Sequence, residues 1–189
     1  MEKTLTLVLG GARSGKSVFA ERLAREGGRV LFAASAEAKD DDMARRIAAH
    51  RARRPASWDT LEAPIDLASE LAEAADGYDT VLLDCLTVWV ANLLLRRGPG
   101  PGAEAEAATA GRELLRAYEE GSAAWIVVSN EVGLGVVPPT ELGRDYRDAL
   151  GRVNQLVAQR ADRVYLTVAG LATELKALGA QPVALNEEA

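Results

Sequence analysis

"GGARSGKS", residues 10–17, decides the fold expected for this chain of 189 residues. The stretch matches the pattern G-x-x-x-x-G-K-[ST] at Gly10, Gly15, Lys16 and Ser17. The apolar run "TLTLVLG" leads into it, and the helical pattern "SVFAERLAREGG" follows it. Such a strand–loop–helix unit aims backbone N–H groups and a helix N-terminus at phosphate oxygens. The sequence therefore predicts a phosphate-binding P-loop.

Each defining residue of the motif has a chemical task. Gly10 and Gly15 permit backbone conformations that side chains would block, Lys16 can reach the β and γ phosphates, and the Ser17 hydroxyl can bind Mg²⁺. We predict that the whole loop contacts nucleotide, through Gly10, Gly11, Ala12, Arg13, Ser14, Gly15, Lys16 and Ser17.

Apolar runs and helical patterns alternate along the rest of the chain. The runs end near Gly10, Ser35, Leu86, Asn130 and Gly170 and are typical of strands buried on both faces. This alternation predicts an α/β fold with a mostly parallel sheet flanked by helices, over one domain of residues 1–189. The expected helices cover 17–26, 41–54, 65–75, 103–120 and 140–161.

Two low-complexity or polar stretches break this pattern. Residues 96–111, rich in Gly, Pro, Ala and Glu, read as a surface loop that leads into a polar helix. The last twelve residues, "LGAQPVALNEEA", allow one short extra strand before a frayed acidic end.

Composition excludes several classes of protein. The net charge is −6 and the pI is near 5.0, so no overall field attracts nucleic acid. No apolar run reaches the roughly 18 residues of a membrane span, and the amino-terminal residues show no signal-peptide pattern. A single cysteine, Cys85, cannot form an intramolecular disulfide, and one histidine gives no zinc cluster. We expect a cytoplasmic protein that has no permanently bound cofactor and does not bind nucleic acid.

A P-loop needs a second acidic group for its metal ion, usually at the end of another apolar strand. Asp84 in "TVLLDCL" meets this requirement, since four apolar residues lead directly into it. An ordinary polar residue at a strand end is the alternative, and Glu131 in "SNEVG" is a rival carboxylate. The neighbouring Cys85 is interpreted as a small buried residue rather than a nucleophile.

The only histidine, His50, lies in "RRIAAHRARRP", residues 45–55, among five arginines. On a helix it shares a sector with Met43 and Ile47 and has Arg46 and Arg54 on its flanks, so it should face the protein body or a cleft. A satisfied core histidine is the alternative that geometry alone favours. The flanking cations favour an anion site instead, because they would be costly in an apolar core.

Several blocks along the chain, and not the P-loop alone, carry a resemblance to a known family. In order they are "GGARSGKS", "DDDMARRIAAHRARRP", Trp58, "LLDCLTVWVANLL", "SNEVGLGVVP" and "YRDALGRVNQLVAQRADRVYLTVAG". From about residue 4 to about 176, the chain resembles the bifunctional adenosylcobinamide kinase and adenosylcobinamide-phosphate guanylyltransferase family of cobalamin assembly. The 98–111 loop differs in being rich in Gly, Pro and Ala, and the tail beyond Lys176 matches no block of that family. The resemblance implies a RecA-like P-loop NTPase fold and a homo-oligomer, specifically a trimer.

The family implies two reactions. A nucleoside triphosphate, ATP or GTP with Mg²⁺, first phosphorylates the aminopropanol hydroxyl of adenosylcobinamide. GTP then gives GMP to a histidine, which passes it to the new phosphate to form adenosylcobinamide-GDP. By its position in the motif, His50 is the guanylylated residue.

Other nucleotide contacts follow from the resemblance alone. They are Ala34, Ser35 and Ala36 after the second strand, Arg51, Ala52, Arg53 and Arg54 after the histidine, and Glu62 just beyond; Asp84, predicted above from its place at a strand end, completes the set of nucleotide contacts. Arg51 and Arg53 could equally be solvated arginines, and residues 151–162 are interpreted as a packing helix. Two other functions stay open at this point, a P-loop phosphotransferase acting on another small alcohol with a structural His50, and a nucleotide-binding module without turnover.

Overall fold

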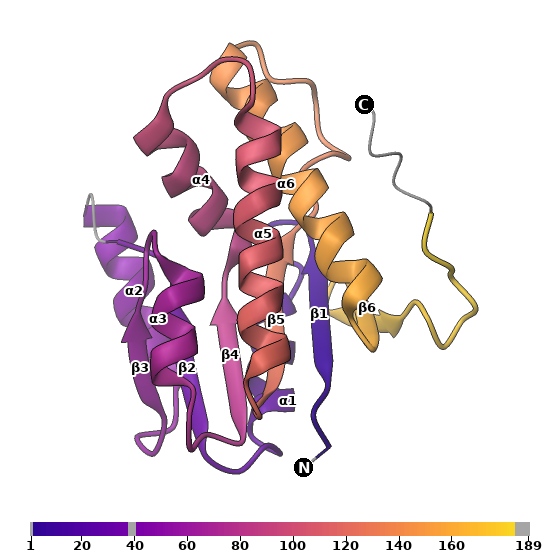
Figure 1. Ribbon diagram of the computed structural model, residues 1–189. Coiled ribbons are helices and arrows are strands. Elements are labelled where there is room, and N and C mark those ends of the chain that lie inside the picture. Colours follow the sequence, from indigo (N-terminus) through magenta and orange to yellow (C-terminus); the bar gives the residue numbers. More distant parts are fainter. Residues whose placement is uncertain (1, 38–40, 184–189) are drawn as a thin grey trace.

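The computed structural model describes residues 2–37 and 41–183 and contains one seven-stranded sheet (Figure 1). The strand order is β3-β2-β4-β5-β1-β6-β7, and every neighbouring pair is parallel except β6 and β7. The predicted α/β class with a mostly parallel sheet is confirmed. The strands are β1 (Leu5–Gly10), β2 (Val30–Ala34), β3 (Asp59–Glu62), β4 (Thr80–Asp84), β5 (Ala124–Asn130), β6 (Arg163–Val168) and β7 (Leu171–Glu174).

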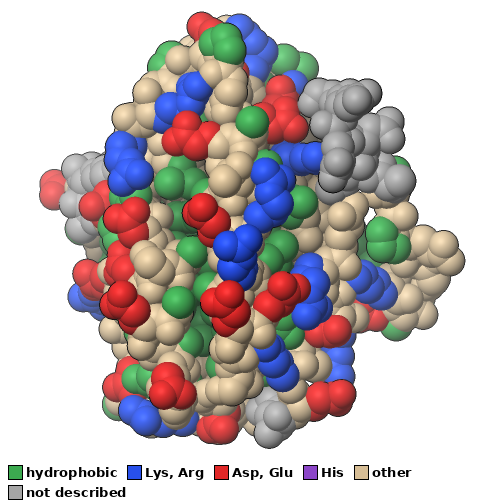
Figure 2. Space-filling view, in the orientation of Figure 1, with side chains coloured by type: hydrophobic (Ala, Val, Ile, Leu, Met, Phe, Trp, Pro, Cys, Tyr) green, Lys and Arg blue, Asp and Glu red, His purple; other side chains and the backbone are tan. Residues whose placement is uncertain are grey.

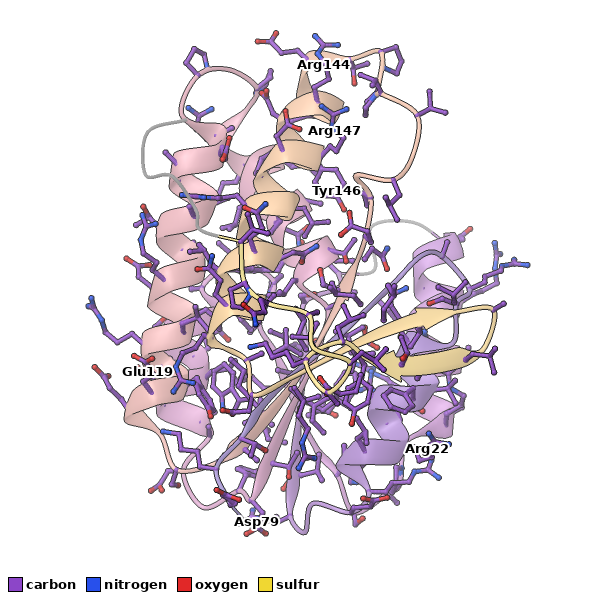
Figure 3. All side chains as sticks on the ribbon, turned by 90° about the vertical axis from the view of Figure 1, so that its right-hand side faces the viewer. Arg22, Asp79, Glu119, Arg144, Tyr146 and Arg147 are labelled. Carbon is purple, nitrogen blue, oxygen red and sulfur yellow. The ribbon has the colours of Figure 1, made fainter. Side chains whose placement is uncertain are left out.

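Helices cover both faces of the sheet. They are α1 (Lys16–Ala24), α2 (Asp41–Arg53), α3 (Leu67–Ala74), α4 (Leu86–Arg97), α5 (Ala103–Glu120) and α6 (Glu141–Arg160). Glu119 of α5 and Arg22 of α1 lie on opposite sides of the sheet (Figure 3). This is the layering that right-handed crossovers between parallel strands produce.

Alternating strand residues fill two apolar layers. On one face, Leu7, Leu83 and Val127 pack with α3 to α6, where Trp89 and Tyr118 are among the largest fully buried side chains. On the other, a smaller cluster around Val8, Phe32 and Val128 packs against Ala20 and Ala24 of α1. The two layers fix the central strands on both faces.

Strand register brings the carboxyl ends of four strands to one edge of the sheet. Gly10 of β1 is paired with Asn130 of β5, and Ala34 of β2 with Asp84 of β4. In open α/β sheets ligands bind outside this edge. The P-loop and the predicted acidic residue are therefore neighbours, although Asp84 comes 67 positions after Ser17, the last residue of the loop.

Several elements differ from the prediction. The strands β3 and β7 and the helix α4 were not expected. Residues 103–111 belong to α5, which agrees with the helix predicted over 103–120 and not with the overlapping loop predicted over 96–111, because Ala103, Ala107 and Ala108 are buried. Strand β6 is exposed at both ends rather than buried throughout. Residues 178–183 form no strand, whereas 184–189 lie outside the described residues.

The surface carries charges of both signs. On the face that shows α5, Lys and Arg side chains are interspersed with Asp and Glu (Figure 2). Within residues 2–37 and 41–183, no helix combines the length and the apolar character that crossing a membrane requires.

Candidate functional site: the cleft at the P-loop

The P-loop turns sharply between β1 and α1. Gly15 precedes α1 with φ at 96°, a left-handed conformation suited to glycine, and Arg13 has φ at 59°. The Lys16 Nζ donates a hydrogen bond to the Gly11 carbonyl at 3.1 Å. The lysine thus lies across its own loop, where incoming phosphates can replace the carbonyl as its partner.

Strand β6 supports the loop from one side. A Cβ atom on Gly10 would lie 2.2 Å from the Thr167 Oγ1 and 2.5 Å from the Ser14 Oγ, so only glycine fits there. Those two hydroxyls are 2.8 Å apart, and the Gly170 N–H donates to the Ser14 carbonyl at 2.9 Å. Sequence reasoning missed Thr167, because a threonine inside an apolar strand carries no motif.

Asp84 lies at the end of β4, beside the start of α1. Its carboxylate accepts a hydrogen bond from the Ser17 hydroxyl. Burial raises the pKa of Asp84 above its usual range, and nearby His50, the Ser17 bond and Lys16 oppose that rise. A hydroxyl and a carboxylate next to a phosphate-binding loop are hard oxygen donors, which suit Mg²⁺. These two residues therefore fit the metal predicted for this site.

Glu131, the rival carboxylate, is directed elsewhere. Its Oε1 accepts a hydrogen bond from the Gly133 N–H at 3.0 Å, in the loop that follows β5. Glu131 does not belong to the residues that line the P-loop cleft. The geometry favours Asp84 as the carboxylate of the metal site.

His50 reaches the same cleft from α2. Its Nδ1 lies 3.7 Å from the Asp84 Oδ2 and 3.3 Å from the Arg53 Nη2, and 34% of its side chain is exposed. A half-exposed histidine on a cleft wall is not the fully enclosed core residue of the alternative interpretation. The side chains of Met43 and Arg46, predicted beside it, lie outside the described part of the chain.

The arginines after His50 differ in their surroundings. The Arg53 Nη2 pairs with the Glu21 Oε1 at 3.1 Å, and Arg51 forms an ion pair with Glu62. Arg54 lies over the Phe32 ring, 3.3 Å from its centroid, and burial lowers the pKa of its guanidinium while the charge of Asp84 opposes this. Arg51, Arg53 and Arg54 therefore line the cleft around the histidine, where their guanidinium groups can bind an anionic ligand.

The cleft has a volume of about 760 Å³, within the range of small-molecule sites. It brings together most of the residues predicted from the sequence, namely Ala12, Arg13, Ser14, Gly15, Lys16, Ser17, Ala34, Ala36, His50, Arg51, Arg53, Arg54, Glu62 and Asp84. It also includes residues that sequence reasoning did not name, among them Phe32, Thr87, Val88 and Asn130.

Four predicted contacts do not line the cleft: Gly10, Gly11, Ser35 and Ala52. Ser35 is fully buried, and its Oγ donates to the Cys85 carbonyl at 2.7 Å and accepts from the Cys85 N–H at 3.1 Å. Its side chain joins the ends of β2 and β4 and is not turned to a ligand. Ala52 is exposed on α2.

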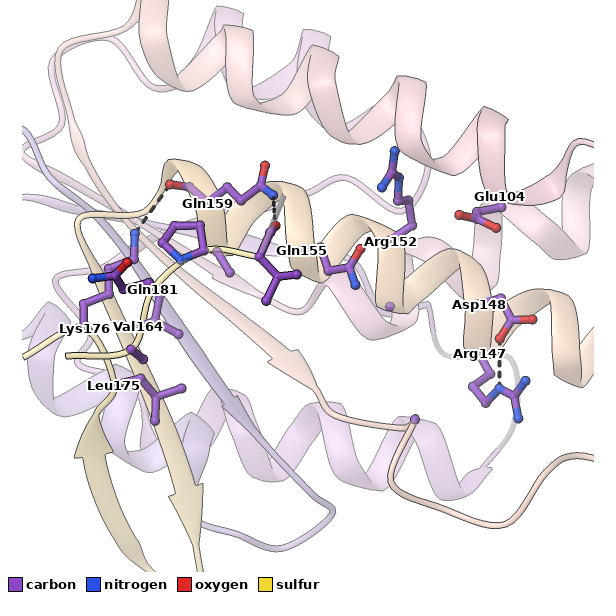
Figure 4. A pocket seen from close by; sticks show the side chains of 16 residues that line it. Glu104, Arg147, Asp148, Arg152, Gln155, Gln159, Val164, Leu175, Lys176 and Gln181 are labelled. Carbon is purple, nitrogen blue, oxygen red and sulfur yellow. Dashed lines mark hydrogen bonds and ion pairs between the residues drawn. The ribbon is translucent and has the colours of Figure 1, made fainter. Parts of the chain in front are cut away.

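A second cavity of about 730 Å³ lies along α6 and the segment after β7 (Figure 4). Arg152, Gln155 and Gln159 line it, while Val153 and Val157 of the same helix are buried in the core. Residues 151–160 thus form a packing helix, as predicted, with one polar side on this cavity. No P-loop residue contributes to it.

Comparison with known proteins gives the family. Residues 6–175 match the family described as cobinamide kinase / cobinamide phosphate guanyltransferase. Over 172 residues, which cover 90% of this chain and 96% of the relative, the chain is 52% identical to the bifunctional adenosylcobalamin biosynthesis protein CobP of Pseudomonas aeruginosa. It is 39% identical over 181 residues to the bifunctional adenosylcobalamin biosynthesis protein CobU of Salmonella typhimurium, covering 91% of this chain and 99% of that one. The chain belongs to the cobinamide kinase / cobinamide phosphate guanyltransferase family.

Proposed function

We propose that this protein phosphorylates adenosylcobinamide on its aminopropanol hydroxyl and then transfers GMP from GTP, through His50, to form adenosylcobinamide-GDP. Family membership supports both activities. The observation that carries the assignment to residues is that one cleft holds the P-loop, Asp84 and His50, with 3.7 Å between the imidazole and the carboxylate. A kinase acting on another alcohol would need no histidine at that position.

In the kinase step, the substrate hydroxyl oxygen bonds to the γ-phosphorus while the bond from that phosphorus to its bridging oxygen breaks. The hydroxyl proton is released to water. Lys16 and the loop N–H groups bind the phosphates. Ser17 and Asp84 would hold Mg²⁺, which would neutralise negative charge on the phosphates. Either ATP or GTP can satisfy this set, because all of these contacts are to phosphate.

In the guanylyl step, an imidazole nitrogen of His50 bonds to the α-phosphorus of GTP, and pyrophosphate leaves as the bond to its bridging oxygen breaks. A phosphate oxygen of adenosylcobinamide phosphate then attacks that phosphorus and releases the histidine. Arg51, Arg53 and Arg54 offer cations to the charge that develops on the leaving group. The imidazole acts as the nucleophile that divides one displacement into two.

Self-association and location are part of the same proposal. We expect a trimer in the cytoplasm, without a nucleic-acid partner. Large apolar side chains stand exposed on the loop after β5 and on both sides of the β6–β7 turn, including Leu134 at 87%, Val136 at 94% and Leu171 at 77%. Exposed apolar groups of this kind mark interaction surfaces when they adjoin. The molar mass, measured by light scattering as the protein elutes from a size-exclusion column, tests the trimer. A monomer at micromolar concentration would contradict it.

Labelling with α-³²P-GTP tests the central claim. After denaturation, label on the protein that is acid-labile and alkali-stable is expected, as for a phosphoramidate, and should map to the peptide with His50. An unlabelled protein that still phosphorylates alcohols would support a simple phosphotransferase instead. A protein that binds GTP and releases no pyrophosphate would be a module without turnover.

A further inference from the structure

Among the described side chains of the helix that carries His50, polar contacts rather than buried apolar groups attach it to the body of the protein. None of the described side chains of α2 is buried, in contrast to every other helix of the described chain. Figure 1 shows α2 on the side of the sheet that carries β2 and β3. Helix side chains that are not buried contribute little packing free energy. The position of His50 therefore depends on the charged groups that hold α2 to the body.

Glu21 supplies the most enclosed of these groups. It lies in α1, one turn beyond Ser17, and only 5% of its side chain is exposed. Its Oε1 is 3.1 Å from the Arg53 Nη2. A carboxylate in this position is costly without a partner and would repel phosphates bound at the neighbouring loop. Its place next to a phosphate site is explained by the arginine that it holds, not by contact with nucleotide.

Arg53 connects Glu21 to the histidine. The same Nη2 that pairs with Glu21 lies 3.3 Å from the Nδ1 of His50, one turn earlier on α2. Arg25 then donates a hydrogen bond to the Arg53 carbonyl at 3.2 Å. The end of α1 thus holds Arg53 by both its side chain and its backbone, next to the imidazole.

We propose that Glu21 is a positioning residue for guanylyl transfer, which holds α2 through Arg53 so that His50 faces Asp84 and the triphosphate. The inference rests on the proposed function of His50. Phosphoryl transfer does not need this contact, because Lys16 and Ser17 start α1 and Asp84 ends β4, independently of α2. Loss of the Glu21 charge should therefore affect one half-reaction much more than the other.

The test uses Glu21→Gln, which keeps the shape of the side chain, and Glu26→Gln as the matched control at an exposed carboxylate just beyond α1. In Glu21→Gln, the rate of His50 labelling by α-³²P-GTP should fall roughly tenfold or more, a change of about 1.4 kcal/mol in the barrier. Kinase turnover should stay within about threefold. Backbone amides of α2 should exchange hydrogen faster, because a local opening becomes easier. Glu26→Gln should match the wild type in all three measurements.

A double variant tests whether Glu21 acts through Arg53. If it does, adding Glu21→Gln to Arg53→Gln should change the labelling rate by less than about twofold, since the contact is already absent. Additive losses, wild-type labelling in Glu21→Gln, or equal loss of both half-reactions at an unchanged melting temperature would overturn the inference. If the wild-type protein takes up no label, the proposed function fails instead, and α2 exchange in Glu21→Gln still tests the positioning.

Discussion

The imidazole of His50 and the carboxylate of Asp84 face each other in one cleft, with 3.7 Å between Nδ1 and Oδ2. The same carboxylate accepts a hydrogen bond from Ser17, in the first turn after the P-loop. The predicted nucleophile of one reaction and the predicted metal ligand of the other are therefore in contact. This arrangement fits a single triphosphate site that serves both half-reactions in turn.

Replacement of Lys16 by Ala tests the single site. The change removes the cation nearest the β and γ phosphates, so both phosphoryl and guanylyl transfer should fall by roughly a hundredfold or more. Initial rates of each half-reaction provide the comparison. Both are measured on one preparation of the variant whose melting temperature equals that of the wild type. Damage confined to one reaction would show that the two use separate sites.

Asp84→Asn should raise the Mg²⁺ concentration needed for half-maximal activity and leave the fold intact. Burial raises the pKa of Asp84, so the folded protein holds its proton more tightly than the unfolded chain. For such an acid, stability is lost as the pH rises through the folded pKa. With EDTA present at pH 7, the variant should melt at the same temperature as the wild type or slightly higher. An unchanged Mg²⁺ requirement would show that Asp84 does not bind the metal ion.

The sequence was most informative where residues follow regular patterns. The strand–loop–helix context of the P-loop, the five predicted strands and the mostly parallel sheet follow from fixed spacing and continuous apolar runs, and the structure confirms them, although β6 is only partly buried. Strand β3, "DTLE", was missed because it is a short edge strand with exposed side chains. Helix α4, "LTVWVANLLLRR", was missed because its apolar residues follow the β4 run directly.

The contacts around the site were less predictable. Glu21 reads as an ordinary acidic residue of an amphipathic helix, and only the fold places it against Arg53, 32 residues away. Thr167 likewise reaches Ser14 across 153 residues. The low-complexity sequence of residues 103–111 allowed two overlapping predictions, a loop and the first half of a helix, because small alanines suit close packing of a helix as well as they suit a loop, and the helix is confirmed. Local patterns predict elements, whereas partners distant in sequence require the folded chain.

Cys85 should be unreactive despite lying on the cleft wall. Burial, followed by the charge of Asp84, raises the pKa of the Cys85 thiol to about 11. Since the thiolate is the reactive form, alkylation by iodoacetamide at pH 8 should be roughly a hundredfold slower in the folded protein than in urea. The folded state should also lose stability as the pH rises from about 9 to about 11, where only the unfolded chain has released this proton. Rapid alkylation of the native protein would restore Cys85 as a candidate nucleophile.

His50→Asn separates the two half-reactions most sharply. Asparagine keeps a polar group of similar reach and removes the nucleophile, so the first displacement on GTP has no path. Guanylyl transfer and label uptake should fall by about three orders of magnitude or more. Phosphoryl transfer should fall by less than about tenfold, because the P-loop, Ser17 and Asp84 keep their positions.

The comparison needs a variant that is folded and retains α2. Melting temperature and hydrogen exchange of the α2 amides provide that control, and exchange of pyrophosphate into GTP reports the first displacement alone. Equal loss of both activities in a folded variant would contradict the division of labour between His50 and the P-loop. Wild-type guanylyl transfer would make His50 a structural residue, and its approach to Asp84 would then serve only to hold α2 on the body of the protein.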